Sequence, residues 1–238
     1  GLSGGALGFA LLQGLANLPA RGDKQKLSQM RGEGLRRGAF LSFPATAGLL
    51  ALAFPLADML FGHGEYDSRS VALTAQSLCG YAPAIPALCA TRPLLAAVNA
   101  LGNRKTPMAI GLFSLVPLVL FGLAAVFLWG GEEHGKGMAA VGLGLSAAAW
   151  TNTWLWSRAL RSRGIISLPP GSLCPLAVYA AASLLMWALL RSGLRAVSEP
   201  GAICMAILVV GAALLWLFGF KAAGNKDAGA LLSLFRKR

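Results

Sequence analysis

Hydrophobic residues in this chain gather into long runs with few charges. A run of about 20 apolar residues is long enough to cross a bilayer as an α-helix, which rises about 1.5 Å per residue. The sequence lacks the alternation of apolar and polar positions that marks the strands of an outer-membrane barrel. The runs lie at 2–19, 39–61, 71–100, 108–129, 138–157, 175–190 and 201–220. We therefore predict an all-α, polytopic transmembrane helical bundle of about seven spans.

Positive charge is concentrated in alternate connections between these runs. Of the 21 lysines and arginines, sixteen lie in 20–38, 101–107, 158–174 and 221–238, and four lie in the other connections. Because short loops rich in Lys and Arg stay in the cytoplasm, this asymmetry predicts that those four segments, with the C-terminus, are cytoplasmic. The same topology accounts for the net charge of +12, so we expect no nucleic-acid partner.

The composition agrees with a membrane protein and offers little metal chemistry. Only 13% of the residues are charged, whereas soluble domains carry about a quarter. The four cysteines lie within or at the edge of apolar runs, form no CxxC pair and have only two histidines to join them. Such cysteines usually pack as small apolar side chains, so we expect neither a metal nor a cofactor.

The run 71–100 has the most unusual sequence. It contains Pro83, Pro86 and Pro93, each of which removes a backbone donor and kinks a helix, and Arg92 precedes the last of them. Broken helices are tolerated in membranes where they face protein or a water-filled cavity. An arginine at this depth costs several kcal/mol unless it has a partner or water. Two interpretations of Arg92 stay open: an anion contact in a cavity, or a side chain that snorkels to the cytoplasmic headgroups.

Polar residues elsewhere in the runs have a simpler interpretation. Hydrogen bonds between helices are the common role of amide side chains in spans. The residues concerned are Gln13, Asn17, Gln76, Asn99 and Asn152.

An enzyme is the rival class, and the sequence argues against it. A membrane hydrolase or phosphotransferase needs clustered carboxylates, a histidine or a nucleophile at one interface. Glu65 with Asp67, and Glu132 with Glu133, are the only close acid pairs, and both lie in short outer loops without metal-ligand spacing. The sequence also has no Walker motif for nucleotide hydrolysis.

Four segments of the chain carry recognisable sequence motifs. Residues 55–67 read PL, then LFGHGEYD. This segment resembles P-L … L-F … G-x-F-[DT], the outer-loop signature of the MurJ/MviN lipid II flippase family. Residues 81–107 match its spacing, with a basic residue at Arg92 and a closing KTP. Residues 142–161 and 5–11 look like two further helices of the family. The resemblance covers essentially the whole chain and corresponds to the family's C-terminal half, its eighth to fourteenth helices.

The chain also departs from the family. Residues 17–20 read NLPA where the family has Pro-Ser-Leu-Ser, and 99–101 replace its aromatic and basic residues. The functional arginine of the family's eighth helix would fall before Gly1, and the chain opens inside an apolar run rather than with Met. We therefore expect a fragment that lacks the N-terminal half of the same protein.

The resemblance implies one lobe of a two-lobe alternating-access transporter of the bacterial inner membrane. Residues 1–160 would form five spans of that lobe, and 161–238 would add two C-terminal helices and a basic cytoplasmic tail. The substrate would be lipid II, an undecaprenyl-pyrophosphate that carries the peptidoglycan precursor, and membrane lipids would surround the chain. The last two runs, 175–190 and 201–220, would form a groove for the lipid tail.

The candidate contacts to the lipid headgroup are polar residues of the spans. They are Arg92, Gln76, Asn99 and Asn152. Two other functions stay open: a related flippase or antiporter that exports polysaccharide repeat units or drugs, and a membrane scaffold for cell-wall enzymes.

Overall fold

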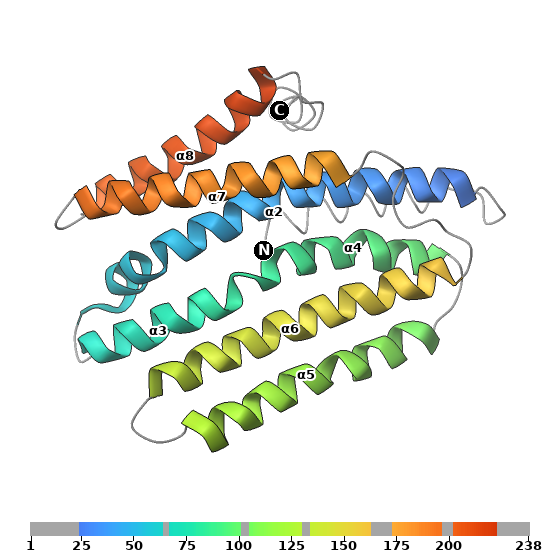
Figure 1. Ribbon diagram of the computed structural model, residues 1–238, viewed down its shortest axis with the longest axis horizontal. Helices are drawn as coiled ribbons and strands as arrows, with labels where there is room; N and C mark the ends of the chain where they lie inside the picture. Colours follow the sequence, from blue (N-terminus) through green and yellow to red (C-terminus); the bar gives the residue numbers. More distant parts are fainter. Residues whose placement is uncertain are drawn as a thin grey trace.

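The computed structural model describes residues 24–63, 67–100, 105–129, 134–162, 173–196 and 202–222. Within these ranges the fold is all-helical, as the sequence predicts, and no strand occurs (Figure 1). In chain order the helices are α2 (Lys24–Phe61), α3 (Ser68–Tyr81), α4 (Ala84–Ala100), α5 (Lys105–Trp129), α6 (His134–Arg161), α7 (Leu173–Ala196) and α8 (Ala202–Ala222).

Four segments of the described residues are long and apolar enough to cross a membrane. They are Arg31–Phe61, Ser68–Leu95, Pro107–Phe127 and Pro175–Leu194, and Ile207–Lys221 is a shorter apolar helix. Helix α6 is not among them, because Trp150, Asn152 and Trp154 lower the mean hydropathy of the predicted run 138–157. The run 2–19 lies outside the described residues. The count of about seven spans therefore stays a prediction.

Helix α2 begins earlier than its apolar run does. The sequence predicts a connection over 20–38, yet the helix begins at Lys24. This segment is rich in Lys, Gln, Leu, Met and Arg, which have high helix propensity, and Arg37 pairs with Glu33 one turn earlier at 3.4 Å. Hydropathy predicts where a chain meets lipid, so it does not detect a helix that continues beyond the bilayer.

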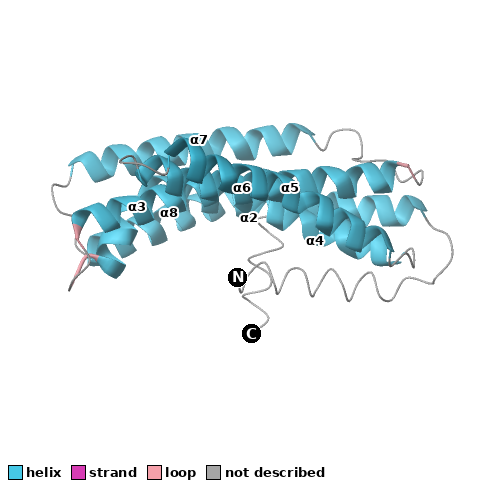
Figure 2. Ribbon diagram, turned by 90° about the horizontal axis from the view of Figure 1, so that it is seen from below, coloured by secondary structure: helices cyan, strands magenta, loops and turns pink. Residues whose placement is uncertain are grey.

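The helices lie side by side in a thin, elongated layer (Figures 1 and 2). Helix α2 packs against α7, α3 and α4, and α6 packs against α3, α4 and α5. At one end of the layer, on the left of Figure 1, α2 and α7 end and α3 and α6 begin; we call this the Phe61 end. The opposite end, where α2 begins and α6 ends, is the Lys24 end.

Apolar clusters join the helices at several levels. Phe40 of α2, Tyr179 of α7, and Trp216 with Phe220 of α8 form an aromatic cluster in which the Phe40 and Tyr179 ring centroids lie 5.2 Å apart. Trp216 Nε1 donates a hydrogen bond to Phe40 O at 3.1 Å. A second cluster joins α4, α5 and α6 toward the Lys24 end: Leu94, Ala97, Val98, Ile110, Trp156 and Leu160.

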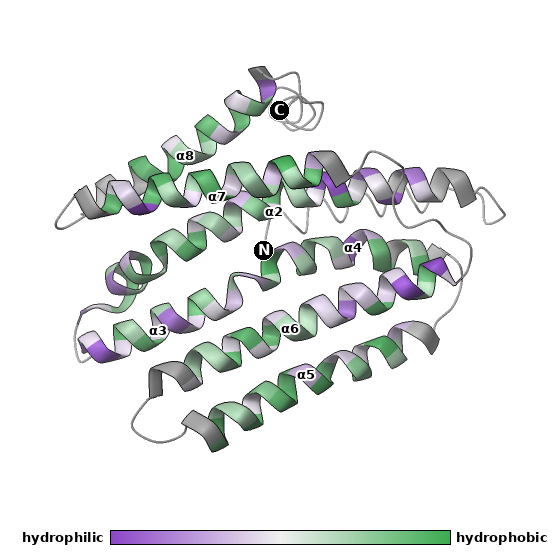
Figure 3. Cartoon of the chain, in the orientation of Figure 1, coloured by the Kyte–Doolittle hydropathy of each residue, from purple (hydrophilic) through white to green (hydrophobic). Residues whose placement is uncertain are grey.

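Much of the apolar surface is exposed, as a membrane protein requires. Helix α5 exposes large side chains that include Leu112, Phe113, Val116 and Phe127, and Figure 3 shows it as hydrophobic over most of its length. In water such a surface would be an aggregation liability, whereas lipid is its natural solvent.

Candidate functional site

The predicted break in the run 71–100 is present. Helix α3 ends at Tyr81 and α4 begins at Ala84, with Ala82 and Pro83 between them. Pro83 has no amide hydrogen with which to continue the helical ladder. Pro93 lies inside α4 without ending it. The sequence therefore predicts the break correctly, although only the first of the three prolines falls in it.

Side chains from neighbouring helices donate hydrogen bonds to the backbone around the break. Three donors lie on one face of α6, at spacings of four and three residues, and a fourth donor, Thr46 of α2, lies 3.3 Å from Ala82 O. The three from α6 are Ser146 Oγ to Gly80 O at 2.6 Å, Trp150 Nε1 to Pro83 O at 3.0 Å and Thr153 Oγ1 to Ala87 O at 2.9 Å. Carbonyls near a broken ladder thus find partners in a medium that offers little water.

Glycines allow α3 and α6 to approach closely at this place. A Cβ atom on Gly80 would lie 2.6 Å from Ala139 O and 2.9 Å from Gly142 Cα, and Gly142 meets the same constraint from the other side. Small residues at helix contacts in membranes let two backbones touch. The contact of α3 and α4 with α6, held by these glycines and hydrogen bonds, is called the α6 seam below.

Arg92 lies on α4 away from the α6 seam. Its neighbour Thr91 faces α6, where its hydroxyl lies 3.0 Å from that of Thr153, and Pro93 and Leu94 are buried. The Arg92 side chain is exposed in this chain. It is therefore available to an anion or to a lipid headgroup, which are the two interpretations that the sequence leaves open.

Asn152 combines burial with an unsatisfied oxygen. It lies on α6 one turn before the buried Trp156, and its side chain is half-buried. Its Oδ1 atom has no hydrogen-bond donor among the described residues. A buried acceptor without a partner is uncommon in native structures, so a donor from water, from a ligand or from another part of the protein is expected here.

The other two candidates occupy opposite ends of the broken span. Gln76 is exposed on α3 and lies toward the Phe61 end, while Asn99 lies in the last turn of α4, and only its backbone is described. Sixteen residues separate Gln76 from Arg92, which corresponds to about 24 Å of helical rise. Gln76 lines a cavity whose lining includes neither Arg92 nor Asn152. Gln76 and Arg92 therefore do not share that cavity.

Arg31 is a residue that sequence reasoning missed. The hydropathy pattern places it in the connection 20–38, yet it lies on α2 with only 3% of its surface exposed. Its charge is close enough to that of Arg161, in the last turn of α6, for the two to interact. The available signal was the pair Gly32 and Gly34, both buried, because glycines permit close packing of a helix.

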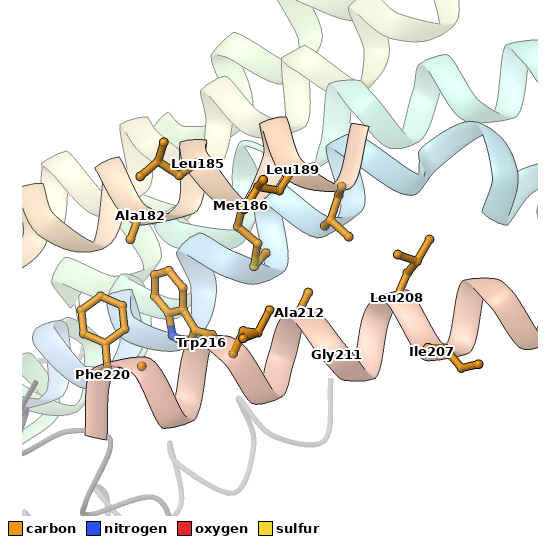
Figure 4. Close-up of a pocket in the computed structure, with 13 residues that line it drawn as sticks. Ala182, Leu185, Met186, Leu189, Ile207, Leu208, Gly211, Ala212, Trp216 and Phe220 are labelled. Carbon is orange, nitrogen blue, oxygen red and sulfur yellow. The ribbon is translucent and has the colours of Figure 1, made fainter. Parts of the chain in front are cut away.

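An apolar groove lies between α7 and α8 (Figure 4). It has a volume of about 640 Å³ and is lined by apolar or glycine residues of both helices, among them Leu185, Met186, Leu189, Ile207 and Gly211. The single ring nitrogen in its lining, that of Trp216, already donates to a backbone carbonyl. The surface of this groove is therefore mostly apolar, which suits a hydrocarbon chain.

Comparison with known proteins decides the family. A family model described as "Lipid II flippase MurJ" matches residues 1–216. The chain belongs to the MurJ lipid II flippase family. The lipid II flippase MurJ of Burkholderia cenocepacia is 30% identical over 235 residues, which are 93% of this chain and 44% of that protein. The probable lipid II flippase MurJ of Bdellovibrio bacteriovorus is 32% identical over 127 residues, 53% of this chain and 24% of that protein.

A solved MurJ structure shows the same fold. The structure named "Lipid II flippase MurJ, inward closed conformation" superposes with a TM-score of 0.69 at 18% identity, over 93% of this chain and 43% of that chain. The family resemblance drawn from the sequence motifs is thus confirmed. With its apolar helices, this MurJ-family chain is a multi-pass protein of the bacterial inner membrane. It spans less than half the length of the Burkholderia relative.

Proposed function

We propose that this chain is part of a lipid II flippase, which moves the undecaprenyl-pyrophosphate-linked peptidoglycan precursor from the inner to the outer leaflet by alternating access. Residues 1–160 contribute one lobe of the transporter, and 161–238 add two helices beside it. The other lobe belongs to a part of the protein outside this chain. Membership of the MurJ family supports this function, and transport of this kind requires no covalent chemistry.

The α7–α8 groove is the observation that carries the proposal. A flippase must move a large polar headgroup across about 30 Å of hydrocarbon while the prenyl tail stays in an apolar environment. A polyprenyl chain has no polar group that needs a partner, so a groove lined by apolar side chains and glycines suits it. The groove lies on the two helices that the family resemblance assigns to the tail.

Arg92 is the proposed contact to the pyrophosphate. It is exposed on a helix that follows a break, and guanidinium groups bind phosphate through paired hydrogen bonds. Asn152, with its unsatisfied Oδ1, is a second polar group for the headgroup. Gln76 and Asn99 remain further candidates toward the two ends of the span.

Substitution of Arg92 tests the headgroup contact. In the complete protein, Arg92→Ala should impair complementation of a flippase-depleted strain at normal membrane levels, and Arg92→Lys should retain part of the activity because the charge survives. Arg158→Ala, which removes an exposed arginine at the end of α6, is the matched control. Full complementation by Arg92→Ala would show that this side chain only snorkels.

The orientation of the chain is a further part of the proposal. The uneven distribution of cations supports a cytoplasmic C-terminus and a cytoplasmic Lys24 end. Single cysteines introduced at Lys24 and Glu65 of the complete protein test this in intact cells. An impermeant thiol reagent should label position 65 and not position 24, and the reverse pattern would overturn the topology.

Depletion of the complete protein separates lipid II transport from the alternatives. Under the proposed function, lipid II accumulates in the inner leaflet and the synthesis of cell-wall polymer stops. If a polysaccharide repeat unit or a drug is the cargo, the distribution of lipid II between the leaflets does not change and that compound accumulates. A scaffold for cell-wall enzymes would leave the distribution of lipid II between leaflets unchanged.

A further inference from the structure

A second cavity lies at the Phe61 end, on the other side of α7 from the groove. It has a volume of about 620 Å³, within the range of about 300–1,000 Å³ that is usual for ligand sites. The ends of α2 and α7 and the first parts of α3 and α6 surround it. We call it the Arg191 pocket; its lining includes Phe54, Gln76, Cys79, Leu143, Arg191 and Leu194.

The described lining of the Arg191 pocket is mostly apolar. Among its described side chains Arg191 carries the only charge, and Gln76 supplies an amide. Within the described ranges no carboxylate forms an ion pair with Arg191. Its guanidinium carbon lies 5.7 Å from the centre of the Trp187 ring, and a contact through a ring face occupies none of the five N–H donors. The pocket therefore presents a positioned cation beside an apolar wall.

The depth of Arg191 indicates which kind of anion it meets. The apolar segment of α7 is Pro175–Leu194, so Arg191 lies three residues, or about 4.5 Å of helical rise, from the end of the span. From this depth a long guanidinium side chain can reach the lipid phosphates at the membrane surface. Its paired N–H donors suit a phosphate headgroup there.

The apolar wall argues against a free phosphate ion as the occupant. An inorganic anion would leave Phe54, Leu143 and Leu194 facing empty space or water, whereas an acyl chain would cover them. A guanidinium pairs with a phosphate oxygen pair through a fork of two hydrogen bonds. An amphiphile with a phosphate and a hydrocarbon chain therefore matches both halves of the pocket.

We propose that the Arg191 pocket binds an anionic phospholipid of the surrounding membrane, with its phosphate on Arg191 and one acyl chain along the apolar wall. This site is distinct from the α7–α8 groove: Leu190 borders the groove and its neighbour Arg191 borders the pocket, so α7 separates the two. A bound phospholipid here holds α7 against α2, α3 and α6 at the Phe61 end.

Native mass spectrometry of the complete protein tests this site. The protein is incubated with equal amounts of phosphatidylglycerol and phosphatidylcholine with identical acyl chains, and the bound lipids are counted. The wild type should retain one phosphatidylglycerol in preference to phosphatidylcholine. Arg191→Gln should lower that adduct about tenfold, the equivalent of one charge-assisted hydrogen-bonded contact. Arg191→Lys should be intermediate, because it keeps the charge without the fork.

Two further variants distinguish a pocket from general attraction to charge. Arg69→Gln removes another exposed arginine at the Phe61 end and should change the adduct by less than about twofold, as for an exposed ion pair. Ala72→Leu keeps Arg191 but fills part of the pocket, and should lower the adduct as Arg191→Gln does. Equal effects of Arg69→Gln and Arg191→Gln, or no effect of Ala72→Leu, would each overturn the proposal.

Discussion

The α6 seam and the α7–α8 pair are two helix contacts with opposite kinds of packing. At the α6 seam, glycines bring backbones together and side-chain donors bind the carbonyls around a break. Between α7 and α8, large apolar side chains leave a groove of about 640 Å³, and the polar contact of Trp216 goes to α2 instead. The first contact fixes a geometry, whereas the second leaves room for something that is not protein.

The difference shows how one membrane chain can combine a contact of fixed geometry, the α6 seam, with a contact that leaves space for lipid, the α7–α8 pair. Apolar side chains alone give little direction to helix association in lipid, because lipid tails are equally apolar. Specific geometry therefore comes from glycine contacts and hydrogen bonds, as around Gly80 and Ser146. A surface without them, as between α7 and α8, can exchange protein contacts for lipid contacts at small cost.

The largest expected effect comes from adding a methyl group to the α6 seam. Gly80→Ala places a Cβ against the backbone of α6, which no side-chain rotation relieves, so we expect a loss of about 1–3 kcal/mol in unfolding free energy. Gly122→Ala on α5 is the matched control, since its Cβ would meet nothing within 4 Å. Thermal unfolding of the complete protein in detergent measures both. Equal stability of the two variants would show that the glycine contact is not tight.

The next effect comes from removing one hydrogen bond at the break. Ser146→Ala leaves Gly80 O without its donor from α6, and we expect a loss of about 1 kcal/mol. Ser114→Ala, whose hydroxyl donates to Gly111 O within its own helix, should be nearly silent. The same unfolding assay compares them. A silent Ser146→Ala would mean that another donor replaces the hydroxyl.

A smaller effect, on transport alone, should come from narrowing the groove. Gly211→Leu has space around its Cβ, so the protein should fold normally while the new side chain occupies the groove. Crowding of the bound tail should lower transport about fivefold, the equivalent of about 1 kcal/mol of overpacking. Gly48→Leu on α2, which also has open space but lies outside the groove lining, is the control. Unchanged transport by Gly211→Leu would separate the groove from the substrate path.

The smallest effect concerns the start of α3, outside both contacts. Asp67 caps this helix by accepting a hydrogen bond from Ser70 N at 2.8 Å, and hydrogen bonds from Ser70 hold the pKa of Asp67 below its ordinary value. A lowered pKa in the folded state stabilises the protein above the ordinary pKa of about 3.9, and this stabilisation is lost as the pH falls through the folded value. Asp67→Ala should therefore lower the melting temperature slightly at pH 7, and the difference should shrink on acidification.

A conservative substitution is the control for this cap. Asn caps helices about as well as Asp, so Asp67→Asn should keep most of the stability at pH 7 and show no such dependence on acid. If Asp67→Ala and the wild type differ equally at all pH values, the carboxylate charge has no part in the effect.

Run length and proline content predict the fold class and an interrupted helix in 71–100, and the motifs indicate the family. The sequence does not show which of the three prolines falls in the break. It does not predict which donors satisfy the break. In the sequence Ser146 and Thr153 resemble other small polar residues of spans, and their role depends on the packing of α6 against α3 and α4. Hydropathy also does not indicate that α2 begins at Lys24. The burial of Arg31 likewise depends on tertiary packing.

Polarity within a span indicates each candidate headgroup residue separately, and their arrangement depends on the complete fold. The structure leaves Arg92 exposed, places Gln76 in the lining of the Arg191 pocket and gives the Asn152 oxygen no donor among the described residues. The missing donor of Asn152 cannot be predicted from the sequence, since it depends on what surrounds the side chain.

The central claim is that the α7–α8 groove holds the polyprenyl tail while the α6 seam stays closed. Photocrosslinking measures this directly: a photoreactive undecaprenyl-pyrophosphate probe is bound to the complete protein in membranes, and the labelled peptides are identified by mass spectrometry. We predict labelling on α7 and α8 near Leu189 and Gly211, suppressed by an excess of lipid II. Suppressible labelling at the α6 seam, around Gly80 and Gly142, with none on α7 or α8 would contradict the account.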